Sequence, residues 1–169
     1  MDVLEAILTR RSIRKYTSTP VPAETIQELL KAAMSAPSAA NHRPWHFIVV
    51  DDPAILRRVP EFHPYANVML HASVAIVVCG ESQSGHGYGF WVQDCAAATQ
   101  NLLLAIHAKG LGGVWLGVYP LKERVEGAAK LFRLPENIVC LSIVPFGYPA
   151  EYKEPVNRFE PEKIHHNTW

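Results

Sequence analysis

The chain has 169 residues, of which 49% are hydrophobic and 19% charged. This length and composition predict a single globular domain over residues 1–169 and exclude a largely disordered protein. The 16 Lys and Arg residues balance 16 Asp and Glu residues, so no surplus of positive charge is available for nucleic acid, and no apolar stretch approaches the roughly 20 residues of a membrane span.

The cysteines and the first residues indicate a cytoplasmic protein. Cys79, Cys95 and Cys140 are odd in number, form no Cys-x-x-Cys pair and lie within apolar runs, which is typical of buried thiols in a reducing compartment. The chain starts with Met-Asp-Val-Leu-Glu, which lacks the basic region of a signal peptide.

The first 50 residues predict two helices and a strand. Apolar residues share one helical face over residues 3–9, and a basic segment follows directly. A second amphipathic helix is predicted over residues 22–36, and Pro37 is expected to end it. Residues 46–50 form a β-branched apolar run that predicts a buried strand.

The middle of the chain predicts a central strand and one long helix. Residues 54–59 allow one or two helical turns, and residues 73–79 form a continuous apolar run that predicts a strand buried on both faces. Four glycines and two serines predict a flexible loop over residues 80–89. Residues 91–109 are apolar on most sides, so the helix predicted there is expected to be buried on most sides.

The last third predicts two more strands around an amphipathic helix. Glycines at 110–113 end the long helix, and a strand (114–118), a helix (122–132) and a strand (138–146) follow. Pro145 and Gly147 are expected to interrupt the last strand. The tail from residue 149 onward lacks any periodicity and is expected to be extended. The pattern predicts an α+β layer fold with about four core strands.

Positive charge is concentrated near the N-terminus. Arg10, Arg11, Arg14 and Lys15 fall within six residues, and residues 6–23 contain no acid. Arginine offers planar, bidentate donors suited to phosphate, so a phosphate site is one interpretation. A solvated basic edge is the other.

Two further segments are suited to a flat ligand. The turn at 36–45 is rich in small residues that let a ligand approach the backbone, and Asn41 can donate and accept at the edge of a heterocycle. A plain connection between a helix and a strand is the alternative. The glycines at 112–117 permit close approach as well, although neither a dinucleotide fingerprint nor a P-loop is present.

Metal and nucleophile chemistry are not supported by the sequence. Pro44 separates His42 from His46, so the two histidines do not share a helical face. The cysteines lie in apolar segments that disfavour the thiolate. We expect no metal site and no dedicated catalytic acid or base.

Three segments carry a resemblance to a known family. These are Arg-Arg-Ser-Ile-Arg-Lys-Tyr at 10–16, Pro-Ser-Ala-Ala-Asn-His-Arg-Pro-Trp-His-Phe at 37–47, and the long apolar helix with its glycine exit at 94–112. In this order they resemble the motifs of the nitroreductase family of FMN-dependent oxidoreductases. The similarity runs from about residue 3 to residue 160. One position departs from the usual pattern, since Arg43 stands where the family usually has Gln.

The resemblance implies a fold and an assembly. The fold is an α+β three-layer sandwich in which helices flank a mixed, mainly antiparallel sheet, with an extended C-terminal tail. The assembly is a homodimer with FMN at the interface. NADH or NADPH would reduce the FMN, and a small electron-poor acceptor such as a nitroaromatic, quinone, enal or flavin would take two electrons from flavin N5 in a ping-pong cycle.

The resemblance also implies site residues. Arg10, Ser12 and Arg14 would hold the FMN phosphate and ribityl chain, Arg11 would face the pyrimidine edge of the ring, and Arg158 would close on the phosphate. The remaining cofactor-binding residues are Pro37, Ser38 and Asn41 from the second chain, and the backbone of Trp115, Leu116 and Gly117. Alternatives are a flavin-dependent dehalogenase, a flavin-consuming relative, or a non-catalytic flavin-binding protein. The loop at 80–89 and the stretch at 62–70 are the two candidates for a substrate lid.

Overall fold

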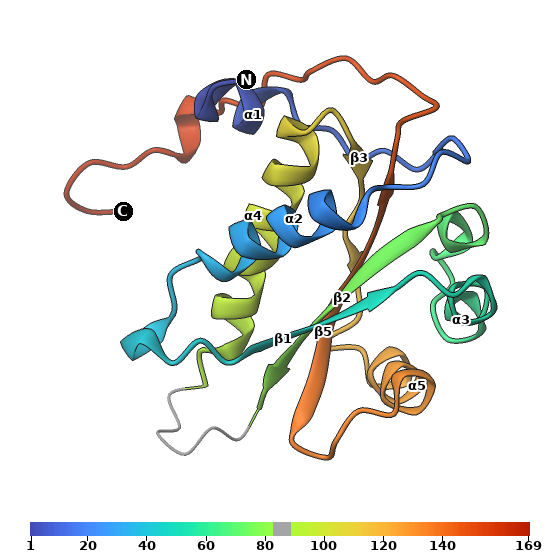
Figure 1. Cartoon of the computed structure of the whole chain (residues 1–169). Helices are drawn as coiled ribbons and strands as arrows, with labels where there is room; N and C mark the ends of the chain where they lie inside the picture. The colour runs from blue at the N-terminus through green and yellow to red at the C-terminus, as the bar shows by residue number, and fades with distance from the viewer. Residues whose placement is uncertain (83–88) are drawn as a thin grey trace.

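The computed structural model describes residues 1–82 and 89–169 (Figure 1). Its α-helices are α1 (Val3–Thr9), α2 (Ala23–Met34), α3 (Pro53–Leu56), α4 (Trp91–Ala108) and α5 (Lys122–Phe132). Its strands are β1 (Trp45–Val50), β2 (Val74–Glu81), β3 (Gly112–Gly113), β4 (Leu116–Gly117) and β5 (Ile138–Gly147). Short 3-10 turns occur at Ala39–Asn41, Val59–Glu61, Asn67–Leu70 and Pro161–Lys163.

The strands form one open sheet between two layers of helices. The strand order is β1-β2-β5-β3, with β4 also paired to β5, and every ladder is antiparallel. Within the described residues, one parallel bridge joins Ser12 to Gly113, so the sheet is mixed and mainly antiparallel, as expected. In Figure 1, α2 and α4 cover one face of this sheet, while α3 and α5 lie on the other.

The central strand β2 shows why the sheet needs both layers. Its side chains alternate between two apolar cores: Ala75, Val77 and Cys79 enter the core on the α3 and α5 side, while the intervening residues enter the core on the α4 side. Alternating strand residues point to opposite faces, so a continuous apolar run is buried only when both faces are covered. The prediction of a central strand is confirmed.

Two boundaries predicted from the sequence were wrong. Gly80 and Glu81, assigned to the glycine-rich loop, continue β2. Residues 83–88 of that predicted loop lie outside the described residues. Pro145 and Gly147 do not interrupt the last strand, because β5 runs through both to its end.

The proline instead interrupts the neighbouring strand. Gly112 pairs with Gly147 and Leu116 with Ile143 in one continuous register, so β3 and β4 are two pieces of a single strand. Across the gap, the Val114 N–H donates to the Pro145 carbonyl at 3.3 Å. Proline has no N–H to return that bond, so the ladder is broken there. The strand predicted at 114–118 is therefore present from Gly112 onward, with this break.

Helix α1 is the least buried of the described α-helices. The Asp2 carboxylate caps its N-terminus by accepting from the Leu4 N–H at 2.7 Å. Thr9 Oγ1 lies 2.8 Å from His107 Nε2, which attaches the helix to the C-terminal end of α4. Ala6 is its one buried residue, whereas the side chains at 3, 4, 7 and 8 are exposed.

The three cysteines are free and buried, as predicted. Among the described residues, no helix combines the length and the apolar character needed to cross a bilayer.

Candidate functional site

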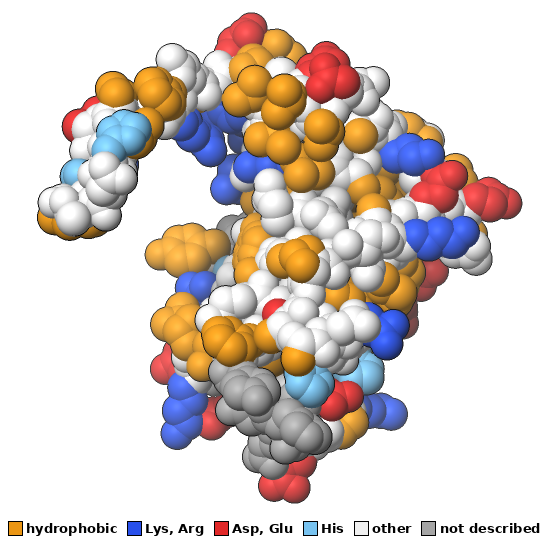
Figure 2. All heavy atoms as spheres, turned by 90° about the vertical axis from the view of Figure 1, so that its left-hand side faces the viewer, with side chains coloured by type: hydrophobic (Ala, Val, Ile, Leu, Met, Phe, Trp, Pro, Cys, Tyr) orange, Lys and Arg blue, Asp and Glu red, His pale blue; other side chains and the backbone are white. Residues whose placement is uncertain are grey.

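A groove of about 590 Å³ lies between the end of α1 and the C-terminal tail. Arg10, Arg11 and Arg158 line it, and none of the described residues lining it is acidic. Figure 2 shows Lys and Arg side chains gathered in the hollow beneath the arching tail. Partial burial, then the charges of Arg158 and Arg11, lower the pKa of Arg10. Three like charges held together without a carboxylate favour an anion in this groove.

The basic segment is attached to the sheet just beyond these arginines. The Ile13 N–H donates to the Gly113 carbonyl at 3.0 Å. The buried Tyr16 hydroxyl lies between the carbonyl oxygens of Ile13 and Pro145, at 2.8 and 3.0 Å, and shares its one proton between them. The first and third predicted motifs, about a hundred residues apart in sequence, therefore lie side by side at one sheet edge.

Arg14 is the predicted phosphate ligand that the groove does not include. Its backbone N–H donates to Glu151 Oε1 at 2.6 Å, and its side chain is exposed outside the groove lining. In an extended segment alternate side chains point to opposite sides. Because Ile13, the residue before it, enters the core, Arg14 turns outward. Its role as an FMN ligand stays a prediction.

The edge of the strand formed by β3 and β4 offers backbone groups that the ladder with β5 does not use. The Val118 N–H donates to the Leu141 carbonyl at 3.0 Å, so position 118 faces β5. Antiparallel pairs alternate, hence the N–H and C=O of Gly117 and Trp115 face away from β5, whereas those of Leu116 face it. No atom lies within 4 Å of the place where a Cβ on Gly117 would be. This edge can accept a flat ligand at Trp115 and Gly117.

The small-residue turn before β1 lies far from the arginine groove in the folded chain. The Ala39 N–H donates to Asp94 Oδ1 at 3.0 Å, which ties the turn to the first turns of α4. Since α4 has 18 residues, its two ends are about 27 Å apart, and α1 is attached at the other end. Figure 1 shows this separation. Pro37, Ser38 and Asn41 thus do not join the arginine groove within one chain.

The backbone of this turn is strained. Ala40, Asn41 and Arg43 have φ of 48°, 57° and 51°, in the left-handed region that non-glycine residues seldom occupy. The Arg43 N–H donates to Ser38 Oγ at 2.9 Å and stabilises this geometry. Strain of this kind, on an exposed turn, favours a functional role over a plain connection.

Sequence reasoning missed two residues that contact Gly117. His63 Nε2 lies 3.0 Å and Arg124 Nη1 lies 2.8 Å from the Gly117 carbonyl oxygen. His63 belongs to the stretch at 62–70 that was one of the lid candidates, yet it is only 2% exposed, and Val68 and Met69 are also buried. No motif marks either residue, and 61 positions separate them, so the sequence offered no signal.

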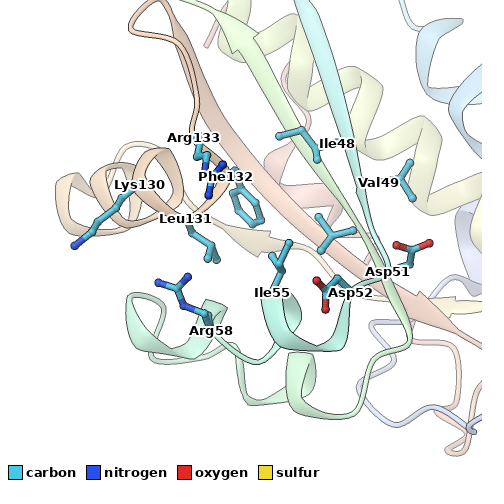
Figure 3. Close-up of a pocket in the computed structure, with 11 residues that line it drawn as sticks. Ile48, Val49, Asp51, Asp52, Ile55, Arg58, Lys130, Leu131, Phe132 and Arg133 are labelled. Atoms are coloured by element: carbon cyan, nitrogen blue, oxygen red, sulfur yellow. The ribbon is translucent and has the colours of Figure 1, made fainter.

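A second cavity, of about 630 Å³, opens between β1, α3 and α5 (Figure 3). Ile48, Ile55 and Phe132 form apolar walls, and Arg58 at its rim pairs with Glu61 at 3.3 Å. None of the predicted cofactor residues lines this cavity. We therefore place the candidate site at the arginine groove and the adjacent strand edge.

The candidate site thus combines a groove that favours an anion with a strand edge whose outward backbone groups lie outside the ladder, on an α+β sheet with helices on both faces. Comparison with known proteins identifies the family. The sequence profile of the nitroreductase family matches residues 7–64 and 61–148, and the chain belongs to this family.

Three relatives illustrate the match. A protein of Methanothermobacter thermautotrophicus with the provisional name NADH dehydrogenase/NAD(P)H nitroreductase is 54% identical over 169 residues, covering 100% of this chain and 88% of the relative. A crystal structure under the same provisional name, from Parabacteroides distasonis, has a TM-score of 0.95 at 44% identity, covering 99% of this chain and 98% of that one. A provisionally named nitroreductase of Desulfovibrio desulfuricans, solved in complex with FMN, has a TM-score of 0.84 at 31% identity, covering 100% and 98%.

Proposed function

We propose that this chain is a single-domain, FMN-dependent NAD(P)H oxidoreductase of nitroreductase type. The observation that carries the proposal is the groove at Arg10, Arg11 and Arg158, which gathers three cations without an acid. The names of the relatives and the FMN complex of one solved neighbour support the same cofactor and electron donor. The buried, reduced cysteines agree with the cytoplasmic location expected from the sequence.

The residues of the chain would bind and orient the cofactor. Arg10 and Arg158 supply charge-assisted donors to the phosphate, together with Ser12 and Arg14 if the segment adjusts on binding. Arg11 lies in the same groove, with its Nη1 donating to the Glu154 carbonyl, so its guanidinium is oriented beside the tail. When bound, FMN supplies the chemistry: it takes two electrons from NAD(P)H and passes them to a small electron-poor acceptor in a second, separate step.

A second copy of the chain would complete the site. The turn with Pro37, Ser38 and Asn41 is too far along α4 to meet the arginine groove of its own chain, so in the proposed homodimer it approaches the groove of the partner. The exposed apolar face of α1, where Leu4 is 65% and Leu8 is 70% exposed, supports an interface at this end of the molecule.

Charge placed on α1 should therefore separate the subunits. We expect the double variant Leu4→Glu, Leu8→Glu to sediment near 18.8 kDa, and the wild type near twice that mass. Burying two carboxylates in an apolar interface costs several kcal/mol. The control Leu70→Glu changes a residue that is 44% exposed on the α3 side, and it should leave the mass unchanged. A wild type that sediments as a monomer would contradict the dimer.

Anaerobic titration tests the proposed activity. The purified protein should be yellow or become so with FMN, and NADH or NADPH should bleach the flavin absorption without any further component. Adding an acceptor should restore the colour, and product analysis then separates reduction of the acceptor from dehalogenation or consumption of the flavin. Bound FMN that neither nucleotide can reduce would indicate a non-catalytic flavin-binding protein and overturn the proposal.

A further inference from the structure

Two side chains from different elements converge on one carbonyl at the open strand edge. His63 follows the 3-10 turn at Val59–Glu61, and Arg124 lies in the first turn of α5. Both nitrogens lie within 3.0 Å of the Gly117 oxygen and within 3.4 Å of each other. A carbonyl on the outer edge of a strand can bond to water instead, so two buried or half-buried protein donors are more than the fold requires.

The hydrogen bonds around the imidazole fix which nitrogen donates. The Tyr65 N–H donates to His63 Nδ1 at 3.3 Å, so Nδ1 is an acceptor. Nε2 then carries the proton and donates to Gly117. Burial, and then the positive charge of Arg124, lower the pKa of His63 and favour this neutral form. The guanidinium of Arg124 also sits 5.5 Å from the centre of the Tyr65 ring, a cation–π contact that holds it in place.

The Gly117 carbonyl belongs to the same residue as the Gly117 N–H, which is the group expected to meet the cofactor. The Gly117 N–H faces the same open edge as its carbonyl. Glycine has the freest backbone of all residues, and the space beside the Gly117 Cα is empty, so no side chain packing restricts its φ and ψ. The N–H lies in the peptide plane shared with Leu116, which pairs with Ile143 of β5, and the carbonyl lies in the next plane. Holding the carbonyl therefore restricts the rotation of one plane against the other about the Gly117 Cα.

We propose that His63 and Arg124 are positioning residues for the FMN site: they hold the Gly117 carbonyl and thereby restrict the φ and ψ of Gly117, whose N–H would face the ring. This inference rests on the proposed function, because the ring is the ligand that the N–H would meet. An N–H fixed in advance stabilises charge that develops on the reduced ring better than a mobile one.

The test compares two disabling variants with a rescue and a control. His63→Leu and Arg124→Met each remove one donor. His63→Leu replaces a neutral side chain and leaves the net charge unchanged, whereas Arg124→Met removes a positive charge. His63→Gln keeps an amide donor. Lys130→Met removes an exposed cation from the same helix, far from the Gly117 carbonyl. For each protein we would measure the dissociation constant of FMN, the midpoint potential of the bound FMN and the unfolding temperature without FMN.

We expect both disabling variants to bind FMN roughly fivefold to tenfold more weakly. We also expect the reduced form to lose more affinity than the oxidised form, so the midpoint potential falls; a tenfold difference is about 30 mV for a two-electron couple. His63→Gln and Lys130→Met should stay within about twofold of wild type. A response shared by the neutral and the charged disabling variants identifies positioning rather than charge.

Two results would overturn the inference in distinguishable ways. Variants that lower only the unfolding temperature, with FMN affinity and potential unchanged, would show that the contacts serve the fold alone. A wild type that takes up no FMN would overturn the proposed function, and the positioning role with it. If His63→Leu does not fold, Arg124→Met against Lys130→Met gives the same decision.

Discussion

Replacing Arg10 by alanine is expected to weaken FMN binding by roughly tenfold to hundredfold, because it removes a charge-assisted contact of about 1.5 to 3 kcal/mol. The FMN-free Arg10→Ala variant should be no less stable than the FMN-free wild type, since Arg10 is held beside Arg11 and Arg158 with no acid in the groove. The measurement is a fluorescence titration of FMN-free protein with FMN, together with thermal unfolding at fixed FMN concentration.

Linkage sharpens the expected result. At an FMN concentration of a hundred times the wild-type dissociation constant, ligand binding adds about 2.7 kcal/mol to the stability of the native state. For Arg10→Ala the same concentration should add only about 0.4 to 1.4 kcal/mol. Arg57→Ala, which removes an exposed arginine near α3, is the matched control and should behave like wild type. Equal dissociation constants for Arg10→Ala and wild type would return the groove to a solvated basic edge.

The variant Arg14→Ala, measured in the same way, tests whether Arg14 binds the FMN phosphate. The resemblance places Arg14 on the phosphate, whereas its side chain lies outside the groove lining. A loss as large as that of Arg10→Ala would mean that the segment closes on FMN. A smaller loss would mean that Arg10 and Arg158 carry the phosphate.

Tyr16→Phe is expected to destabilise the FMN-free protein by about 1 to 3 kcal/mol, although it removes only one oxygen atom. The hydroxyl bridges two buried carbonyls. Pro145 keeps the Val114 N–H at 3.3 Å, but Ile13 loses its hydroxyl donor. Chemical unfolding of the variant measures the cost. Tyr152→Phe is the control, because Tyr152 is 76% exposed, and surface changes usually stay within about 0.5 kcal/mol.

The same residue predicts sensitivity to alkali. Burial, opposed by Arg14 and aided by Glu151, raises the pKa of Tyr16. In the unfolded chain the phenol ionises above about pH 10, while the folded chain keeps it neutral, so stability is lost as the pH rises through that range. Tyr16→Phe should lose less stability than wild type between about pH 10 and 12. A variant with the stability and the alkaline profile of Tyr152→Phe would contradict the bridging role.

Local periodicity was enough to predict most elements of the fold. The helices α1, α4 and α5 and the strands β1, β2 and β5 lie where apolar spacing indicated, because each element buries a face whose period the sequence displays. The errors occurred where a partner strand decides the outcome. Pro145 remains inside β5, and its missing N–H breaks the adjacent strand, which no reading of residues 138–146 alone could reveal.

The site was predictable only where a motif marked it. The arginines near α1 stood out by charge, and the structure brings Arg10, Arg11 and Arg158 into one groove. Their use as FMN ligands stays a prediction. His63 and Arg124 are ordinary residues in unremarkable segments, and only the folded chain brings them to the same carbonyl. Contacts between elements distant in sequence carry no local signature.

The buried cysteines can report local unfolding of the two cores through their reaction with a thiol reagent. Burial, with Asp94 and Cys79 nearby, raises the pKa of Cys95 to about 12, and burial raises that of Cys140 as well. A thiol reagent that needs the thiolate and access will therefore react only with molecules in which the structure has opened around the cysteine. Cys95 belongs to the core beneath α4, and Cys79 and Cys140 to the core on the α3 and α5 side. Equal labelling rates would indicate that both cores unfold together, whereas different rates would indicate that the helices on one face of the sheet detach before those on the other.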